Sequence, residues 1–175
     1  MIVFLAGIHG VGKTYLGAPT AQRLGIRYAT ASQLIREERG LQTWGADKRV
    51  TGIDANQAAL VTATARLRAD GQKLLLDGHF VLREANGSFT EIDAQVFRSL
   101  EINAVVLLVA DVRIVVNRLR ERGDNSWAEE DLLSLANREE AHAHRVAAAL
   151  CIPVIPLVNP TGEEFEKTLN DLINA

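Results

Sequence analysis

The chain has 175 residues, of which 47% are hydrophobic and 23% charged, and its formal net charge is -3, all ordinary values for a globular protein. This mildly acidic balance argues against broad, sequence-independent binding to nucleic acid, which needs a basic face. No apolar run approaches the roughly 20 residues of a membrane-spanning helix. Residues 1–7 lack a basic leader and Cys151 is the only cysteine, so we expect a cytoplasmic protein.

Short apolar runs indicate strands at five places along the chain. They are residues 2–6, an extended stretch from Tyr28, and residues 73–76, 104–110 and 152–158. Two further extended runs, at 80–83 and 89–92, flank Asn86-Gly87, a pair of residues typical of a tight hairpin turn.

Helices are predicted between these strands. Pro19 should bend or split the first of them, at 13–24, because proline removes one helical hydrogen bond. The others are a short helix capped by Ser32, one from residue 54 or 55 to about 70, one from Asp111 to 122, one from Ser126 to about 150, and one from Thr161 onward. Residues 41–52 are expected to be irregular. Strands alternating with helices predict an α/β fold, a three-layer sandwich with a mostly parallel five-stranded sheet, in a single domain spanning 1–175.

The sequence G-x-x-x-x-G-K-T lies between the first expected strand and the first expected helix. Such a loop turns its backbone N–H groups toward phosphate oxygens, and glycines allow the turn. Lys13 should reach the β- and γ-phosphates of ATP, and the Thr14 hydroxyl should ligate Mg²⁺. The expected nucleotide-binding residues are Gly7, Gly10, Val11, Gly12, Lys13, Thr14 and Tyr15. We therefore predict a P-loop NTPase fold that uses ATP and Mg²⁺.

Arginines gather beyond the fourth expected strand and favour phosphoryl transfer. Arg118 and Arg122 are four residues apart, so they should share a helix face at a short lid, about 118–128. Arg138 on the following helix should converge with them. A kinase needs positive charge over the migrating phosphoryl group and must exclude water. We predict that these three arginines are catalytic together with Lys13.

Asp77 follows the expected strand 73–76, which places it at the carboxyl edge of a parallel sheet beside the P-loop. There it could hold a Mg²⁺-bound water, or act as a base if the acceptor is a hydroxyl. His79 is interpreted as structural. His142 and His144 lie two apart on one helix, so they make a poor metal pair and are expected at the surface.

The sequence resembles the nucleoside monophosphate kinase branch of P-loop proteins, and most of all the archaeal-type adenylate kinases. The likeness spans nearly the whole chain: the P-loop, residues 76–83 (LDGHFVLR), the turn at Asn86-Gly87-Ser88, and residues 136–141 (ANREEA). It implies that Arg83 binds the acceptor phosphate and that Arg138 is a lid-side arginine. Arg36 is a further candidate for holding the acceptor. The acceptor-binding part would be about 31–71. Ala31-Ser32 replaces the Gly-Asp pair usual in such kinases, and Gly17-Ala18-Pro19 is unusual for their first helix.

Three functions remain open from these residues. The first is a kinase that transfers the γ-phosphoryl group of Mg·ATP to a nucleoside monophosphate or related small nucleotide, which is already an anionic nucleophile. The second is a kinase of a hydroxyl acceptor, such as a nucleoside, a sugar or a polynucleotide end, with Asp77 as base. The third is an ATP-binding regulatory protein with slow hydrolysis. The oligomeric state is not determined by the sequence.

Overall fold

The structure is a computed structural model that describes residues 1–40, 53–84 and 86–174. Five strands form one sheet in the order β2 (Arg27–Thr30), β3 (Leu74–Asp77), β1 (Ile2–Ala6), β6 (Ala104–Val109) and β7 (Val154–Val158). Every neighbouring pair is parallel. The predicted α/β fold with a five-stranded sheet is therefore confirmed.

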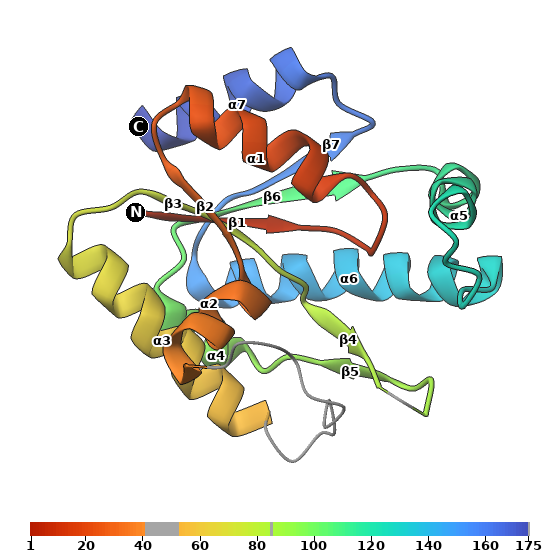
Figure 1. The fold of residues 1–175 in the computed structure, drawn as a ribbon, viewed down its shortest axis with the longest axis horizontal. Coiled ribbons are helices and arrows are strands. Elements are labelled where there is room, and N and C mark those ends of the chain that lie inside the picture. The colour runs from red at the N-terminus through yellow and green to blue at the C-terminus, as the bar shows by residue number, and fades with distance from the viewer. Residues whose placement is uncertain (41–52, 85, 175) are drawn as a thin grey trace.

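Helices cover both faces of this sheet (Figure 1). On one face lie α1 (Lys13–Arg23) and α7 (Gly162–Asn174), and on the other lies the long α6 (Glu129–Leu150). Next to it are α2 (Ala31–Arg39), α3 (Ile53–Ala69) and α4 (Ala94–Leu100), and α5 (Val112–Glu121) stands at the end of the molecule. Because both faces are covered, β1 and β3 are buried along their whole lengths, which explains their unbroken apolar runs.

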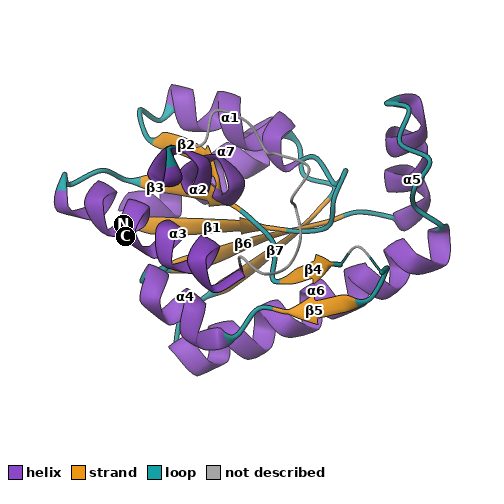
Figure 2. Ribbon diagram, turned by 60° about the horizontal axis from the view of Figure 1, so that its bottom comes forward, coloured by secondary structure: helices purple, strands orange, loops and turns teal. Residues whose placement is uncertain are grey.

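The predicted hairpin is present as β4 (Val81–Arg83) and β5 (Phe89–Glu91), which pair antiparallel. It lies along α6, separate from the main sheet (Figure 2). Ala85 of the expected turn lies outside the described residues, as does the segment 41–52. No helix within 1–40, 53–84 and 86–174 is long and apolar enough to cross a membrane.

Pro19 does not split the first helix into two pieces, which was one of the two predicted outcomes. It lies inside the continuous helix α1 and on its exposed side, whereas Leu16, Thr20 and Ala21 are buried. Packing of that buried face outweighs the one helical hydrogen bond that proline removes.

Two predicted helix caps are also wrong. Thr30, not Ser32, caps α2, since its hydroxyl accepts a hydrogen bond from the backbone N–H of Gln33 at 3.0 Å. The Ser126 hydroxyl donates to Asp124 at 2.6 Å instead of capping a helix, and α6 begins only at Glu129. In both cases the serine hydroxyl can form a hydrogen bond with a neighbouring side chain, and this bond competes with capping of the helix.

The other two predicted caps are confirmed. Asp111 accepts a hydrogen bond from the N–H of Arg113 at 2.8 Å and so caps α5. Thr161 and Glu164 form a reciprocal capping box at the start of α7, because the Thr161 N–H donates to the Glu164 carboxylate and the Glu164 N–H to the Thr161 hydroxyl.

His142 is a further correction, because it is buried and not at the surface. Its Nε2 lies 2.7 Å from the Ile92 carbonyl oxygen and its ring packs edge-on against Phe80. His144, two residues on, is exposed as expected. Residues two apart point to different sides of a helix, so one of the pair can face β5 while the other faces solvent.

Three aromatic rings pack together where the sheet meets α4 and α6. The ring centroids of Phe4 and Phe80 lie 5.0 Å apart, and those of Phe80 and Phe97 lie 4.5 Å apart. Gly78 touches this cluster, because a Cβ atom built on it would lie 2.6 Å from Phe4 Cζ. Phe80 and Phe97 are almost fully buried, so the rings have little room to move.

We therefore expect Gly78→Ala to lower the free energy of unfolding by about 1–3 kcal/mol, the usual cost of overpacking a core. Urea unfolding measures this loss. Gly162→Ala is the matched control, since a Cβ there meets nothing within 4 Å. Equal stability of the two variants would contradict the close packing at Gly78.

Candidate functional site

The segment between β1 and α1 has the conformation of a phosphate-binding loop. Gly7, Gly10 and Gly12 have φ values of 133°, 80° and 116°, which side chains rarely allow. A Cβ atom on Gly7 would lie 2.6 Å from the Leu108 carbonyl oxygen. The loop therefore requires these glycines for its backbone path, and it leads directly into the N-terminus of α1, where anions are favoured.

Lys13 begins α1 and its side chain is only 7% exposed. Its Nζ donates to the Gly7 carbonyl oxygen at 2.6 Å and lies 3.0 Å from His79 Nε2 and 3.8 Å from Asp77 Oδ1. Burial lowers the pKa of Lys13, and the attraction of Asp77 and Glu139 opposes that shift. Burial and the nearby Lys13 charge hold the pKa of His79 well below its usual range, so the ring is neutral and its Nε2 can accept from Lys13.

Asp77 and Thr14 lie next to Lys13 on neighbouring elements. Asp77 ends β3 and is buried, and it lies at the carboxyl edge of the sheet, where the parallel-sheet rule places ligand sites. Thr14 follows Lys13 and is exposed. Tyr28 of β2 reaches both of them: its hydroxyl donates to Asp77 Oδ2 at 2.6 Å and lies 3.2 Å from Thr14 Oγ1. No motif or spacing in the sequence singles out Tyr28.

A hollow of about 620 Å³, here called the large hollow, opens beside these residues. One end is lined by the P-loop, Lys13, Thr14, Asp77 and His79, and much of the rest by side chains of α2, α3 and α4. Those side chains include Asn56, Gln57, Leu60, Val96 and Phe97. The large hollow therefore combines a charged end with a mostly apolar body that carries a few polar groups.

A second hollow of about 360 Å³, the small hollow, lies on the other side of the P-loop. The P-loop itself, Arg118, Arg122 and the Asn159-Pro160 turn after β7 line it. Tyr15 and Arg122 border both hollows. The P-loop thus separates two spaces that open on the same edge of the sheet.

The structure brings two of the three predicted catalytic arginines to the P-loop. Arg118 Nη1 donates to the Val11 carbonyl oxygen at 3.1 Å, and Arg122 lines both hollows. Arg138 is exposed, its guanidinium lies 5.8 Å from the Phe89 ring centroid, and it lines neither hollow. The next residue on α6, Glu139, points to the P-loop, and successive helix residues point about 100° apart.

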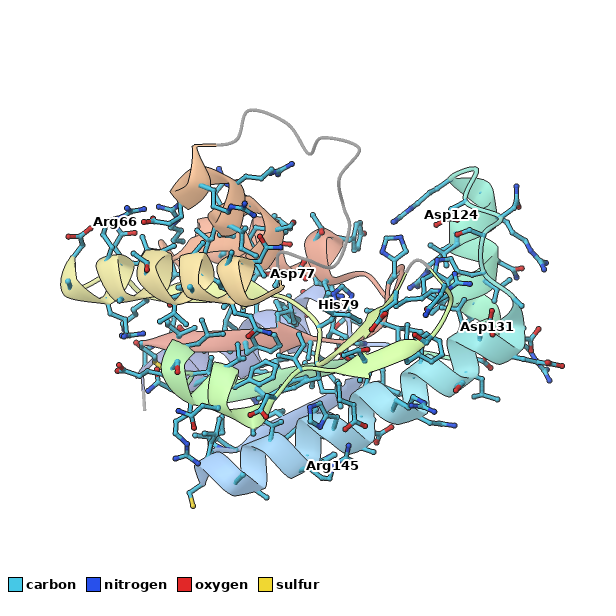
Figure 3. All side chains as sticks on the ribbon, turned by 90° about the horizontal axis from the view of Figure 1, so that it is seen from below. Arg66, Asp77, His79, Asp124, Asp131 and Arg145 are labelled. Carbon is cyan, nitrogen blue, oxygen red and sulfur yellow. The ribbon has the colours of Figure 1, made fainter. Side chains whose placement is uncertain are left out.

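Arg83 is turned toward the lid and not into the large hollow. It donates to the Ser126 carbonyl oxygen at 3.0 Å, lies over the Trp127 ring at 4.3 Å and pairs with Asp131 at 3.6 Å. Figure 3 shows Asp131 and Asp124 at the lid end of the molecule, apart from Asp77 and His79. Arg36 on α2 is partly buried and lines neither hollow.

Glu139 has a role in the site that no sequence pattern predicted. It is 1% exposed, and its carboxylate accepts N–H groups from Gly7 at 3.3 Å, Phe80 at 2.9 Å and Val81 at 2.8 Å. Burial raises the pKa of Glu139, while these N–H donors and Lys13 oppose the shift. Glu139 therefore ties α6 to the first residue of the P-loop and to the chain that leaves β3.

We expect Glu139→Gln to lower the free energy of unfolding by about 2–3 kcal/mol, because an amide NH₂ would face N–H groups that need an acceptor. Urea unfolding measures the loss. Glu140→Gln on the exposed side of the same helix is the control and should stay within about 0.5 kcal/mol of the parent. An equally small effect at both positions would contradict the tethering role of Glu139.

A family model described as an AAA domain matches residues 6–133, more than half of the chain. The match includes the P-loop, Asp77, Arg118 and Arg122. The chain belongs to this family. It is a P-loop protein, and the predicted likeness to archaeal-type adenylate kinases is confirmed by a relative from Pyrococcus furiosus. That relative is named "Putative adenylate kinase" and is 22% identical over 183 residues, which cover 99% of this chain and 83% of the relative.

Solved structures share the fold over nearly the whole chain. Shikimate kinase from Acinetobacter baumannii, in complex with shikimate, gives a TM-score of 0.64 at 17% identity and covers 99% of this chain and 92% of that chain. The YorR protein from Bacillus subtilis, in complex with phosphorylated GDP, gives 0.63 at 18% identity and covers 99% and 96%. At such identities these structures establish the fold alone.

Proposed function

We propose that the chain transfers the γ-phosphoryl group of Mg·ATP to a nucleoside monophosphate or a related small nucleotide. One observation carries this proposal: the charged end of the large hollow is formed by Lys13, Thr14 and Asp77, beside the P-loop. A molecule bound in that hollow would present its reactive group to the phosphate end of a nucleotide held by the loop.

On the donor side, the P-loop N–H groups and the N-terminus of α1 would hold the phosphates. Lys13 would exchange its hydrogen bond to the Gly7 carbonyl for the β- and γ-phosphate oxygens, which is a short movement of a flexible side chain. Arg118 and Arg122 border the small hollow and would add positive charge around the transferred group.

The residues at the loop also fit a magnesium ion. The exposed Thr14 hydroxyl and the Asp77 carboxylate are hard oxygen ligands, and Mg²⁺ commonly takes one or two protein oxygens and completes its shell with phosphate and water. Within the described residues no group of three His, Cys, Asp or Glu forms a cage for a metal. When bound, Mg²⁺ would neutralise charge on the β- and γ-phosphates.

On the acceptor side, the body of the large hollow suits a flat ring with a polar edge. Leu60, Val96 and Phe97 offer apolar surface, and the Asn56 and Gln57 side chains carry both donors and acceptors. A monophosphate acceptor is an anion at neutral pH, so it needs no general base. The lid-side Arg83 would have to leave Ser126 and Trp127 to reach it.

A hydroxyl acceptor is the second candidate, and the position of Asp77 favours it. The Asp77 carboxylate lines the large hollow and lies 3.8 Å from the Lys13 ammonium, within reach of a hydroxyl placed next to the γ-phosphate. The shared fold with shikimate kinase is compatible with such an acceptor but does not assign one.

The proposed function is tested by incubating the protein with Mg·ATP and a panel of nucleoside monophosphates, nucleosides and sugars, and identifying the phosphorylated product by mass spectrometry. We expect product from a monophosphate, and Lys13→Ala should lower turnover by at least about 10²-fold, as loss of a charge stabiliser does. Lys167→Ala, at an exposed position of α7, is the control. Tight ATP binding without any product would instead favour a regulatory protein.

Asp77→Asn separates the two acceptor classes. If the acceptor is a monophosphate, turnover should fall about 10–100-fold through poorer metal positioning, and extra Mg²⁺ should restore part of it. Loss of a general base would cost about 10²–10⁴-fold and would not respond to Mg²⁺. We expect the smaller, magnesium-responsive loss in steady-state assays at several Mg²⁺ concentrations.

A further inference from the structure

Helix α1 carries a glycine on its buried side. Glycine in a helix interior is less favourable than alanine, so the packing around Gly17 should explain why glycine is found there. A Cβ atom there would lie 2.8 Å from Tyr28 Cε2 and 3.0 Å from Leu5 Cδ2. Gly17 therefore makes the space in which the Tyr28 ring lies.

The sheet register brings Tyr28 close to the edge of the sheet where Asp77 lies. Tyr28 pairs with Leu75 and Thr30 pairs with Asp77, so Tyr28 starts two residues short of Asp77 along the strand direction. Two strand residues span about 7 Å. The long phenol side chain covers that distance, and its hydroxyl ends at Asp77 Oδ2, 2.6 Å away, and at Thr14 Oγ1, 3.2 Å away.

The two contacts of the Tyr28 hydroxyl differ in kind. A phenol has one hydrogen to donate. Tyr28 donates it to Asp77, the nearer partner, because a charged carboxylate makes the stronger hydrogen bond. The hydrogen of the Thr14 hydroxyl can then point to the phenol oxygen. That arrangement leaves the lone pairs of Thr14 Oγ1 free for a cation, and it leaves Asp77 Oδ1 facing Lys13.

We propose that Tyr28 is a positioning residue of the magnesium site, holding the Thr14 hydroxyl and the Asp77 carboxylate in a fixed relation. Tyr28 does not line the large hollow itself, so it acts through these two residues. The inference rests on the proposed function, in which both oxygens serve the metal of Mg·ATP.

Tyr28→Phe tests the inference, because it removes the hydroxyl and keeps the ring against Gly17. Binding of ATP is measured by calorimetry without Mg²⁺ and over a range of Mg²⁺ concentrations, with no acceptor present. We expect ATP affinity without Mg²⁺ to stay within about twofold of the parent. The Mg²⁺ concentration that gives half of the maximal change in ATP affinity should rise about tenfold, as when a contact that orients a metal ligand is lost. An unchanged Mg²⁺ dependence, or an equal loss without Mg²⁺, would overturn the inference.

Gly17→Ala provides a second, independent variant. It leaves the tyrosine hydroxyl in place but crowds the ring, so it should raise the Mg²⁺ requirement as Tyr28→Phe does, although alanine is the better helix former. Gly162→Ala at the open start of α7 is the control. A parent-like Mg²⁺ requirement in Gly17→Ala would count against the packing that positions Tyr28.

The double variant Tyr28→Phe/Asp77→Asn shows whether Tyr28 acts through Asp77. If it does, Tyr28→Phe should change the Mg²⁺ requirement by less than about threefold when Asp77 is already altered, because coupled residues are not additive. The full tenfold change in both backgrounds would overturn the inference. If the parent protein itself binds ATP equally well with and without Mg²⁺, that result contradicts the proposed function and not only the role of Tyr28.

Discussion

The buried carboxylate of Glu139 is the contact on which the arrangement of the site depends. It accepts backbone N–H groups from Gly7 at the start of the P-loop and from Phe80 and Val81 after β3. These segments are far apart in sequence. At these residues the backbone N–H groups do not donate to a neighbouring strand. One carboxylate on α6 satisfies them together, so the P-loop, the Asp77 segment and the helix that follows the lid are held as one unit.

The parallel sheet supplies the second constraint. Because β1, β3 and β2 run in the same direction, the P-loop, Asp77 and Thr30 all emerge at one edge. Lys13 can then contact Asp77 and His79, and Tyr28 can reach Thr14 and Asp77. Charged groups that are distant in the sequence thereby meet in a partly water-excluded space, where their interactions are stronger than in bulk water.

The arginines differ in how far the sequence predicted their positions. Arg118 and Arg122 lie at the P-loop as helical spacing indicates. Arg138 was expected to converge with them from the next helix, and Arg83 was assigned by likeness to a family, but here they contact Phe89 and the Ser126-Trp127 segment. A long side chain reaches several partners from one backbone position, and the choice among them depends on neighbouring elements that no local pattern specifies.

The sequence by itself determined the features that depend on local chemistry. The apolar runs of β1, β3 and β6, the glycines and lysine of the P-loop, the hairpin turn, and the position of Asp77 at a strand end all follow from side-chain periodicity and backbone freedom. Only the tertiary structure decided the role of Glu139, the burial of His142 and the contact of Tyr28 with Thr14 and Asp77. These depend on which segments pack together, and a buried polar group takes whatever partner the packing brings within hydrogen-bonding distance.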